Sequence, residues 1–138
     1  MEIYTYNPKE QNRPDLAFYV LSKGLNSGRP SMRSCPNCFV VQSDTKEERN
    51  LLFNYVYILW KADKFSMYFV GSVIPFLRIT DFKKVLNETL QNQSLNHHKI
   101  RFVFSLIVSM KRKQDIFAEK IKTLRSLENA YIRQHIKL

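Results

Sequence analysis

With 138 residues, 44% of them apolar and 13% aromatic, the chain is long enough for one globular domain and too apolar for a disordered tail. The formal net charge of +10, from 22 Lys and Arg against 12 Asp and Glu, favours a polyanionic partner but says nothing about the fold. All three glycines and all five prolines lie at or before Pro75. We therefore expect a single domain with a mixed, turn-rich α/β part (1–75) and a helical part (76–138).

The N-terminal residues 1–7 lack the apolar core of a secretory signal. The longest apolar run, residues 102–110, has about half the length that a membrane span requires. We expect a cytoplasmic protein without a membrane partner.

The first elements in the chain are expected to be a β-prone segment, a short helix and a buried strand. Residues 2–7 alternate weakly between apolar and polar side chains. Pro14 suits the first position of a helix and Gly24 suits a left-handed cap, which together favour a helix over residues 15–23. Residues 38–42, Cys-Phe-Val-Val-Gln, are apolar enough to predict a buried strand.

An amphipathic helix is expected next. Asp44 and Glu47 have the spacing of a capping box, and the helix that they begin runs to about Ala62. Its inward positions are Leu52, Val56 and Leu59.

A strand, a turn and a second amphipathic helix are expected to follow. Residues 65–70 are rich in aromatic and β-branched side chains, and residues 71–75 contain a glycine and a proline. Thr80 is a candidate N-cap for a helix over residues 81–91. Its inward positions are Phe82, Val85, Leu86 and Leu90.

The last helix is expected to start near His98 and to continue toward the C-terminus. The resulting fold class is α+β and dominated by helix. A small sheet in the N-terminal half is covered by helices, and a long amphipathic helix ends the chain. The order of the strands does not follow from the sequence.

The C-x-x-C motif of Cys35 and Cys38 has a spacing that suits zinc, but a tetrahedral site needs two further ligands. His97 and His98, or the cysteines of a second copy, are the alternatives. A strand follows the motif where a thioredoxin-like redox site would have a helix. The favoured interpretation is a turn over residues 36–37 with two packed thiols, without metal or cofactor.

The glycine-rich loop before this motif, K-G-L-N-S-G-R-P, matches neither a P-loop nor a dinucleotide-binding fingerprint. It carries Lys23 and Arg29, and Arg33 follows closely. We expect these three residues to contact a partner, and a solvated turn with solubilising charges is the alternative.

Catalytic signals are few. Asp15, Asp81 and Lys83 supply the letters P-D…D-x-K of some metal-dependent nucleases, but residues two apart at a helix start diverge. We therefore expect no catalytic residues and a non-enzymatic binding protein. A small metal-dependent nuclease is the alternative.

The last helix carries the strongest functional signal. Residues 99–138 hold ten basic and three acidic side chains, an imbalance that a solvated face with i, i+4 ion pairs does not require. The expected ligand is nucleic acid, DNA in the first place, alone or in a nucleoprotein complex. A merely solvated face is the alternative. The candidate binding residues on this helix are Lys111, Arg112, Lys122, Arg125 and Arg133.

Apolar residues late in the same helix exceed what one packed face needs. We expect Leu127, Ile132 and Ile136 to form the interface of a homodimer.

Three segments carry a resemblance to known proteins: L-S-K-G-L-N-S-G-R-P, S-C-P-N-C-F and V-G-S-V-I-P-F-L-R-I-T-D-F-K. Through them the chain resembles a family of small basic bacterial proteins of unknown function linked to mobile elements, phages and antiviral defence systems. Its size and charge are also similar to those of accessory proteins of type II CRISPR effectors. That similarity implies a protein that binds the effector nuclease and strengthens the binding of the nuclease to DNA. A protein-binding inhibitor or structural module without nucleic-acid contact is a further alternative.

Overall fold

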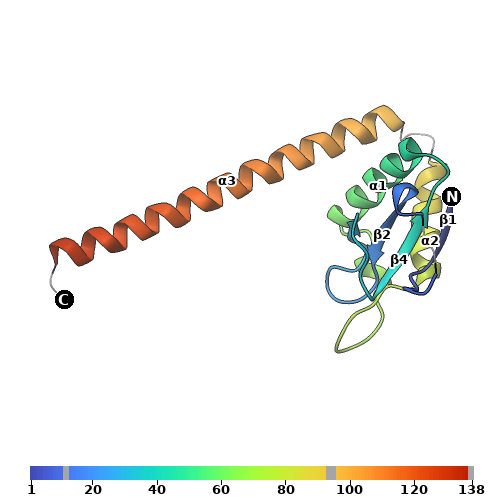
Figure 1. The fold of residues 1–138 in the computed structure, drawn as a ribbon, viewed down its shortest axis with the longest axis horizontal. Helices are drawn as coiled ribbons and strands as arrows, with labels where there is room; N and C mark the ends of the chain where they lie inside the picture. The colour runs from blue at the N-terminus through green and yellow to red at the C-terminus, as the bar shows by residue number, and fades with distance from the viewer. Residues whose placement is uncertain (11–12, 93–95, 137–138) are drawn as a thin grey trace. The chain divides into compact units, whose positions relative to one another are not determined.

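A computed structural model describes residues 1–10, 13–92 and 96–136 and confirms the α+β class, with a long C-terminal helix (Figure 1). The chain divides into two compact units, Met1–Phe102 and Val103–Leu138. The first unit holds the sheet, two helices and the start of a third helix. The described part of the second unit is the remainder of that third helix and the single residue that follows it.

An antiparallel sheet of four strands forms the centre of the first unit, in the order β1-β4-β2-β3. Two of the strands, β1 and β4, were expected from the sequence, and β4 pairs on one side with β1 and on the other with β2. The strands are β1 (Glu2–Thr5), β2 (Ala17–Leu21), β3 (Pro30–Ser31) and β4 (Cys38–Gln42).

Alternate residues of β2 and β4 face opposite sides of the sheet, as the two-residue period of a strand requires. Phe18 and Val20 point toward the core that the sheet shares with helices α1 (Lys46–Lys61) and α2 (Ile79–Gln91). A smaller cluster lies on the opposite face, where Tyr4 and Tyr6 pack against it. Its buried members are Ala17, Tyr19, Cys38 and Val40.

The expected helix at residues 15–23 is wrong. Only Pro14–Leu16 turns, as the short 3-10 helix η1, and β2 begins at the next residue. The run Ala17–Leu21 is buried on both faces and is paired on both edges, so its fit to the sheet outweighs the local helix signals. Gly24 does adopt a left-handed φ of 94°, but in the turn that follows a strand.

Helix α1 starts one residue later than its expected capping box. Thr45 is the N-cap, because its hydroxyl accepts a hydrogen bond from the Glu48 N–H at 3.1 Å. The Glu48 carboxylate in turn accepts from the Asp44 N–H at 3.0 Å. The expected inward residues Leu52, Val56 and Leu59 are buried.

The expected strand at residues 65–70 is also wrong. Phe65 is buried in the core, and Ser66–Tyr68 form a 3-10 turn, η2. Val70 forms an isolated bridge with Phe76, which closes the expected turn at residues 71–75.

Helix α2 begins two residues before its expected start. Arg78 is its N-cap without a side-chain cap bond, so Thr80 lies inside the first turn. Phe82, Val85 and Leu86 are buried as expected, and Leu90 is half-buried.

Helix α3 (His97–His135) starts within one residue of its expected position, and residues 137–138 lie outside the described part. Its first turn belongs to the first unit: Ile100 is buried, and His97 Nδ1 lies 3.2 Å from the Tyr55 hydroxyl. From Val103 onward, every described residue is half-buried or exposed. Within the described ranges, no helix has both the length and the apolar content needed to cross a membrane.

Candidate functional site

The basic residues expected on α3 are all exposed, and four of them share one side of the helix. At about 100° per residue, Lys111, Lys122, Arg125 and Arg133 fall within about 80° of one another. We call these four residues the basic stripe. Arg112 lies about 100° from Lys111, so it is exposed but outside the stripe.

The N-terminal end of the basic stripe is neutralised within the helix. The Lys111 ammonium donates to the Asp115 carboxylate at 2.9 Å, and Glu119 follows one turn later. Lys122, Arg125 and Arg133 make no ion pair with any residue that the structure describes. The charge available to a partner is therefore concentrated toward the C-terminal end of α3.

The other expected basic residues lie in the first unit, on and after the hairpin turn between β2 and β3. Lys23, Arg29 and Arg33 are exposed. The Arg29 guanidinium also lies 5.7 Å from the centre of the Trp60 ring, which the Lys61 ammonium approaches to 5.0 Å. Arg29 thus has a packing role that the sequence did not indicate, because residues 29 and 60 meet only in the folded chain.

Two neighbouring loops of the first unit expose apolar side chains that the sequence analysis did not single out. The Gly24 N–H donates to the Pro75 carbonyl at 2.7 Å, which joins the β2–β3 turn to the loop that projects after η2 (Figure 1). Leu25, Val73 and Ile74 are exposed on these loops. The available signal was a short apolar run inside a turn, V-G-S-V-I-P.

The C-x-x-C motif forms the expected turn. The buried Cys38 thiol donates to the Cys35 carbonyl at 2.9 Å, and burial raises the pKa of Cys38 to about 12. Both cysteines are free thiols. Among the described residues, no three His, Cys, Asp or Glu side chains lie where they could share a metal ion, so the structure does not assemble a Cys2His2 set with His97 or His98.

The two acidic residues of the nuclease alternative lie at the starts of different elements. The Asp15 backbone carbonyl accepts a hydrogen bond from Arg49 at 2.7 Å, near the start of β2. The Asp81 carboxylate accepts from Arg78 at 3.1 Å, at the start of α2. They are not part of any metal-binding cluster of described residues.

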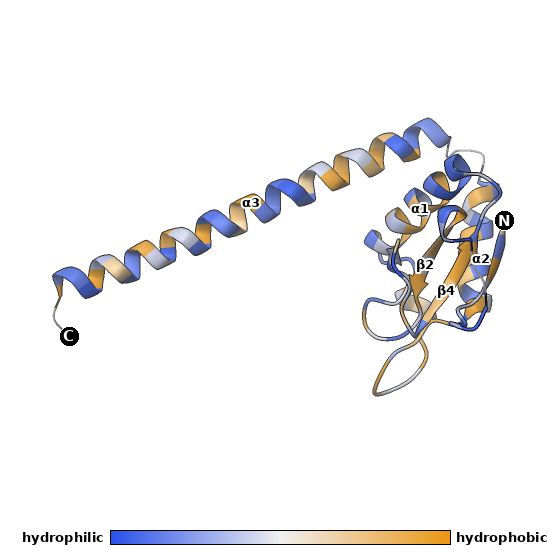
Figure 2. Cartoon of the chain, viewed as in Figure 1, coloured by the Kyte–Doolittle hydropathy of each residue, from blue (hydrophilic) through white to orange (hydrophobic). Residues whose placement is uncertain are grey.

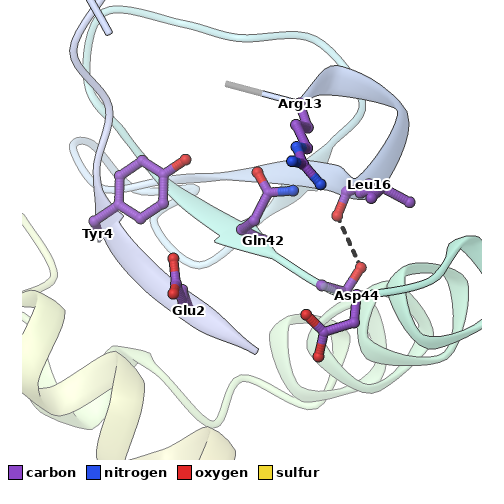
Figure 3. Close-up of a pocket in the computed structure, with 7 residues that line it drawn as sticks. Glu2, Tyr4, Arg13, Leu16, Gln42 and Asp44 are labelled. Atoms are coloured by element: carbon purple, nitrogen blue, oxygen red, sulfur yellow. Dashed lines mark hydrogen bonds between the residues drawn. The ribbon is translucent and has the colours of Figure 1, made fainter. Parts of the chain in front are cut away.

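A polar hollow of about 360 Å³ lies where β1, η1 and the end of β4 meet (Figure 3). The Ser43 hydroxyl closes one side by donating to the Leu16 carbonyl at 2.8 Å. Arg13 faces the hollow together with the carboxylates of Glu2 and Asp44. The Asp44 carboxylate also lies 3.8 Å from the N-terminal ammonium of Met1, so the charges around the hollow balance and it has no excess of positive charge for a polyanion.

The expected dimer residues Leu127 and Ile132 are exposed on α3, and Ile136, which directly follows its last residue, is exposed as well. Their exposure leaves them available to a partner chain. The homodimer itself stays a prediction.

Comparison with known protein families gives a match. The sequence model of DUF6943, a family of unknown function, matches residues 3–134 and so spans nearly the whole chain. No curated protein and no solved structure shows significant similarity. The expected links to mobile elements, phages and CRISPR effectors therefore stay predictions.

Proposed function

We propose that this chain, which belongs to that family of unknown function, is a non-enzymatic accessory protein that binds the phosphate backbone of a nucleic acid in the cytoplasm. DNA is the proposed form, either free or held by a nuclease such as a CRISPR effector. The observation that carries the proposal is the group of three exposed cations, Lys122, Arg125 and Arg133, on one side of α3 without a carboxylate partner among the described residues.

The proposed contacts join basic side chains to phosphate groups and hold the protein in position on the nucleic acid. A flexible ammonium or a planar guanidinium neutralises a phosphate and releases a condensed counterion. Contacts of this kind carry no information about the base sequence, so little sequence preference is expected from the protein itself. Three contacts to duplex DNA predict a log–log salt slope of about −3, and cations of the first unit would make it steeper.

The test replaces Lys122→Glu, Arg125→Glu and Arg133→Glu together. Affinity for a duplex of about 20 base pairs is measured by fluorescence anisotropy over a range of salt concentrations. Each counterion released into about 0.1 M salt contributes a factor of about 8, so losing three contacts weakens binding about 500-fold. Folding is expected to survive, because all three side chains are exposed.

A control variant tests whether the position of the reversed charges matters or only their number. Lys46→Glu, Lys64→Glu and Lys84→Glu change the net charge equally, and all three side chains are exposed in the first unit. The control is expected to lose much less affinity than the α3 variant. Equal losses, or an α3 variant that binds with unchanged affinity and slope, would show that the stripe is only a solvated face. Cleavage of the duplex in Mg²⁺ would favour the nuclease alternative.

A further inference from the structure

An apolar seam runs along the part of α3 that belongs to the second unit. Its main column repeats every seven residues: Val103, Met110, Phe117, Leu124 and Tyr131. The last four are exposed by 58%, 60%, 64% and 67% of their surface. Figure 2 shows the corresponding alternation of apolar and polar bands along the helix. Exposure of so many large apolar side chains on one line indicates a surface that a partner covers.

The period of this seam indicates what kind of partner covers it. Ile107 and Ile121 stand four residues after column members, at two of the five a positions of a heptad pattern in which the column takes the d positions. Gln114, Glu128 and His135 hold the other three a positions. A straight helix has 3.6 residues per turn, and a repeat of 3.5 keeps one line of side chains facing another helix through a left-handed supercoil. A flat membrane surface or a nucleic-acid groove sets no such period. The seam therefore suits a second helix.

The surface also has the local shape that helix pairing needs. Leu124, Leu127, Glu128 and Tyr131 occupy positions i, i+3, i+4 and i+7 and surround a shallow hollow of about 430 Å³, with Ile132 at its rim. Four residues in this arrangement form the hole that accepts one side-chain knob of a facing helix. The expected dimer residue Leu127 is thus part of the seam's edge.

The charges beside the seam decide which helix fits. The charged residues at the flanking e and g positions of residues 103–135 are Lys111, Lys113, Lys120 and Arg125, and all are basic. In a parallel pair of identical helices, Lys120 would face Arg125 of the other copy. In an antiparallel pair, flanks of the same kind meet, so basic side chains again face basic side chains. Self-pairing therefore places like charges together in both orientations.

We propose that α3 forms a heterotypic coiled coil with a helix of an acidic protein. That helix presents apolar residues in its own a and d columns and Glu or Asp at its flanks. The proposal goes beyond nucleic-acid binding and does not depend on it. Lys122 and Arg133 lie outside the seam and its flanks, so they remain available to phosphates when the coiled coil has formed.

The probe is a synthetic peptide of about four heptads with Ile at a, Leu at d and Glu at e and g. Repulsion between the flanking Glu side chains of two copies keeps the peptide from pairing with itself. A second peptide carries Lys in place of every flanking Glu. Binding of each peptide to the full-length protein is measured by fluorescence anisotropy. The acidic peptide is expected to bind, and the basic peptide is expected to bind at least about tenfold more weakly.

Two protein variants test the seam and its flanks separately. Leu124→Gln replaces one apolar side chain that the partner helix would bury, and Lys113→Glu with Lys120→Glu reverses two flanking charges. Each is expected to weaken binding of the acidic peptide by about tenfold or more. Lys122→Glu with Arg133→Glu is the matched control for charge, and it is expected to change this affinity less than threefold.

Three results would overturn the proposal. The acidic peptide could fail to bind at micromolar concentrations, or the control pair could weaken it as much as the flanking pair does. The protein without peptide could also sediment as a dimer while the Leu124→Gln variant sediments as a monomer. That result would assign the seam to a second copy of the chain. Duplex binding by the Lys113/Lys120 variant is a separate readout, so loss of one interaction is distinguishable from loss of the other.

Discussion

Gly28 allows a sharp test of how the first unit is packed. Its φ is 94°, in the region that side chains other than glycine rarely adopt. A Cβ at this position would overlap the ring of buried Phe65, at 2.9 Å from Cγ and 3.0 Å from Cε2, with Cδ2 closer still. Gly24 has the same φ of 94° but nothing within 4 Å of the corresponding Cβ position. The two glycines therefore separate backbone strain from steric overlap.

The expected losses of stability differ accordingly. The left-handed backbone alone costs about 1–2 kcal/mol for a residue with a Cβ, which is the whole effect expected for Gly24→Ala. Forcing an extra methyl group into a packed core adds about 1–3 kcal/mol. Gly28→Ala is therefore expected to lose about 2–5 kcal/mol, a large part of the stability of a domain of this size.

The assay is urea unfolding followed through the fluorescence of Trp60, the single tryptophan, which contacts Arg29 in the turn that contains Gly28. A second variant, Phe65→Leu, removes the ring, so the loss caused by Gly28→Ala is expected to shrink by about 1 kcal/mol or more in that background. A loss for Gly28→Ala no larger than that for Gly24→Ala would refute the packing argument.

Three further predictions concern the first unit. Thr45→Ala is expected to cost about 1 kcal/mol in urea unfolding and Asp44→Ala much less, because Thr45 accepts the cap hydrogen bond. Half-buried Cys35 is expected to react with iodoacetamide before buried Cys38, as mass spectrometry of the native and unfolded protein would show, and elemental analysis is expected to find no zinc. Stability is expected to fall from about pH 9 to about pH 12, since the pKa of Cys38 rises from 9.0 to about 12 on folding and the unfolded chain loses this proton first. Equal reactivity of both thiols, or stability that rises over this pH range, would contradict the burial of Cys38.

Periodic signals in the sequence predicted the helices well. The inward residues of α1 and α2 were identified because one face of each helix packs on the sheet and the 3.6-residue period records that face. The start of α3 was predicted within one residue. The helix starts that depend on single caps were less accurate, by one residue at Thr45 and by two at Ile79. Side chains beside a helix start compete for the same few N–H groups, so sequence spacing alone does not choose among them.

The candidate site also combines features that the sequence predicted with features that it did not. The exposure and alignment of Lys122, Arg125 and Arg133 follow from helical geometry, which made them predictable. The partial neutralisation of Lys111 was less evident, because it depends on which acidic neighbour its side chain reaches. Arg29 was predicted as a partner-binding residue, but its contact with Trp60 depends on how α1 lies beside the hairpin turn.

The sequence by itself determined the charge of this protein, the confinement of its glycines and prolines to residues 1–75, and the seven-residue repeat of α3, because these are properties of composition and short spacing. Only the tertiary structure decided that Ala17–Leu21 is a strand, because the pairing that stabilises it comes from β4 and β3. It also decided that Phe65 is an anchor in the core, where its ring fills the space that Gly28 leaves open. The partners that β4 supplies to β2 and that Gly28 supplies to Phe65 lie many residues away in the chain, and only the folded backbone brings them into contact.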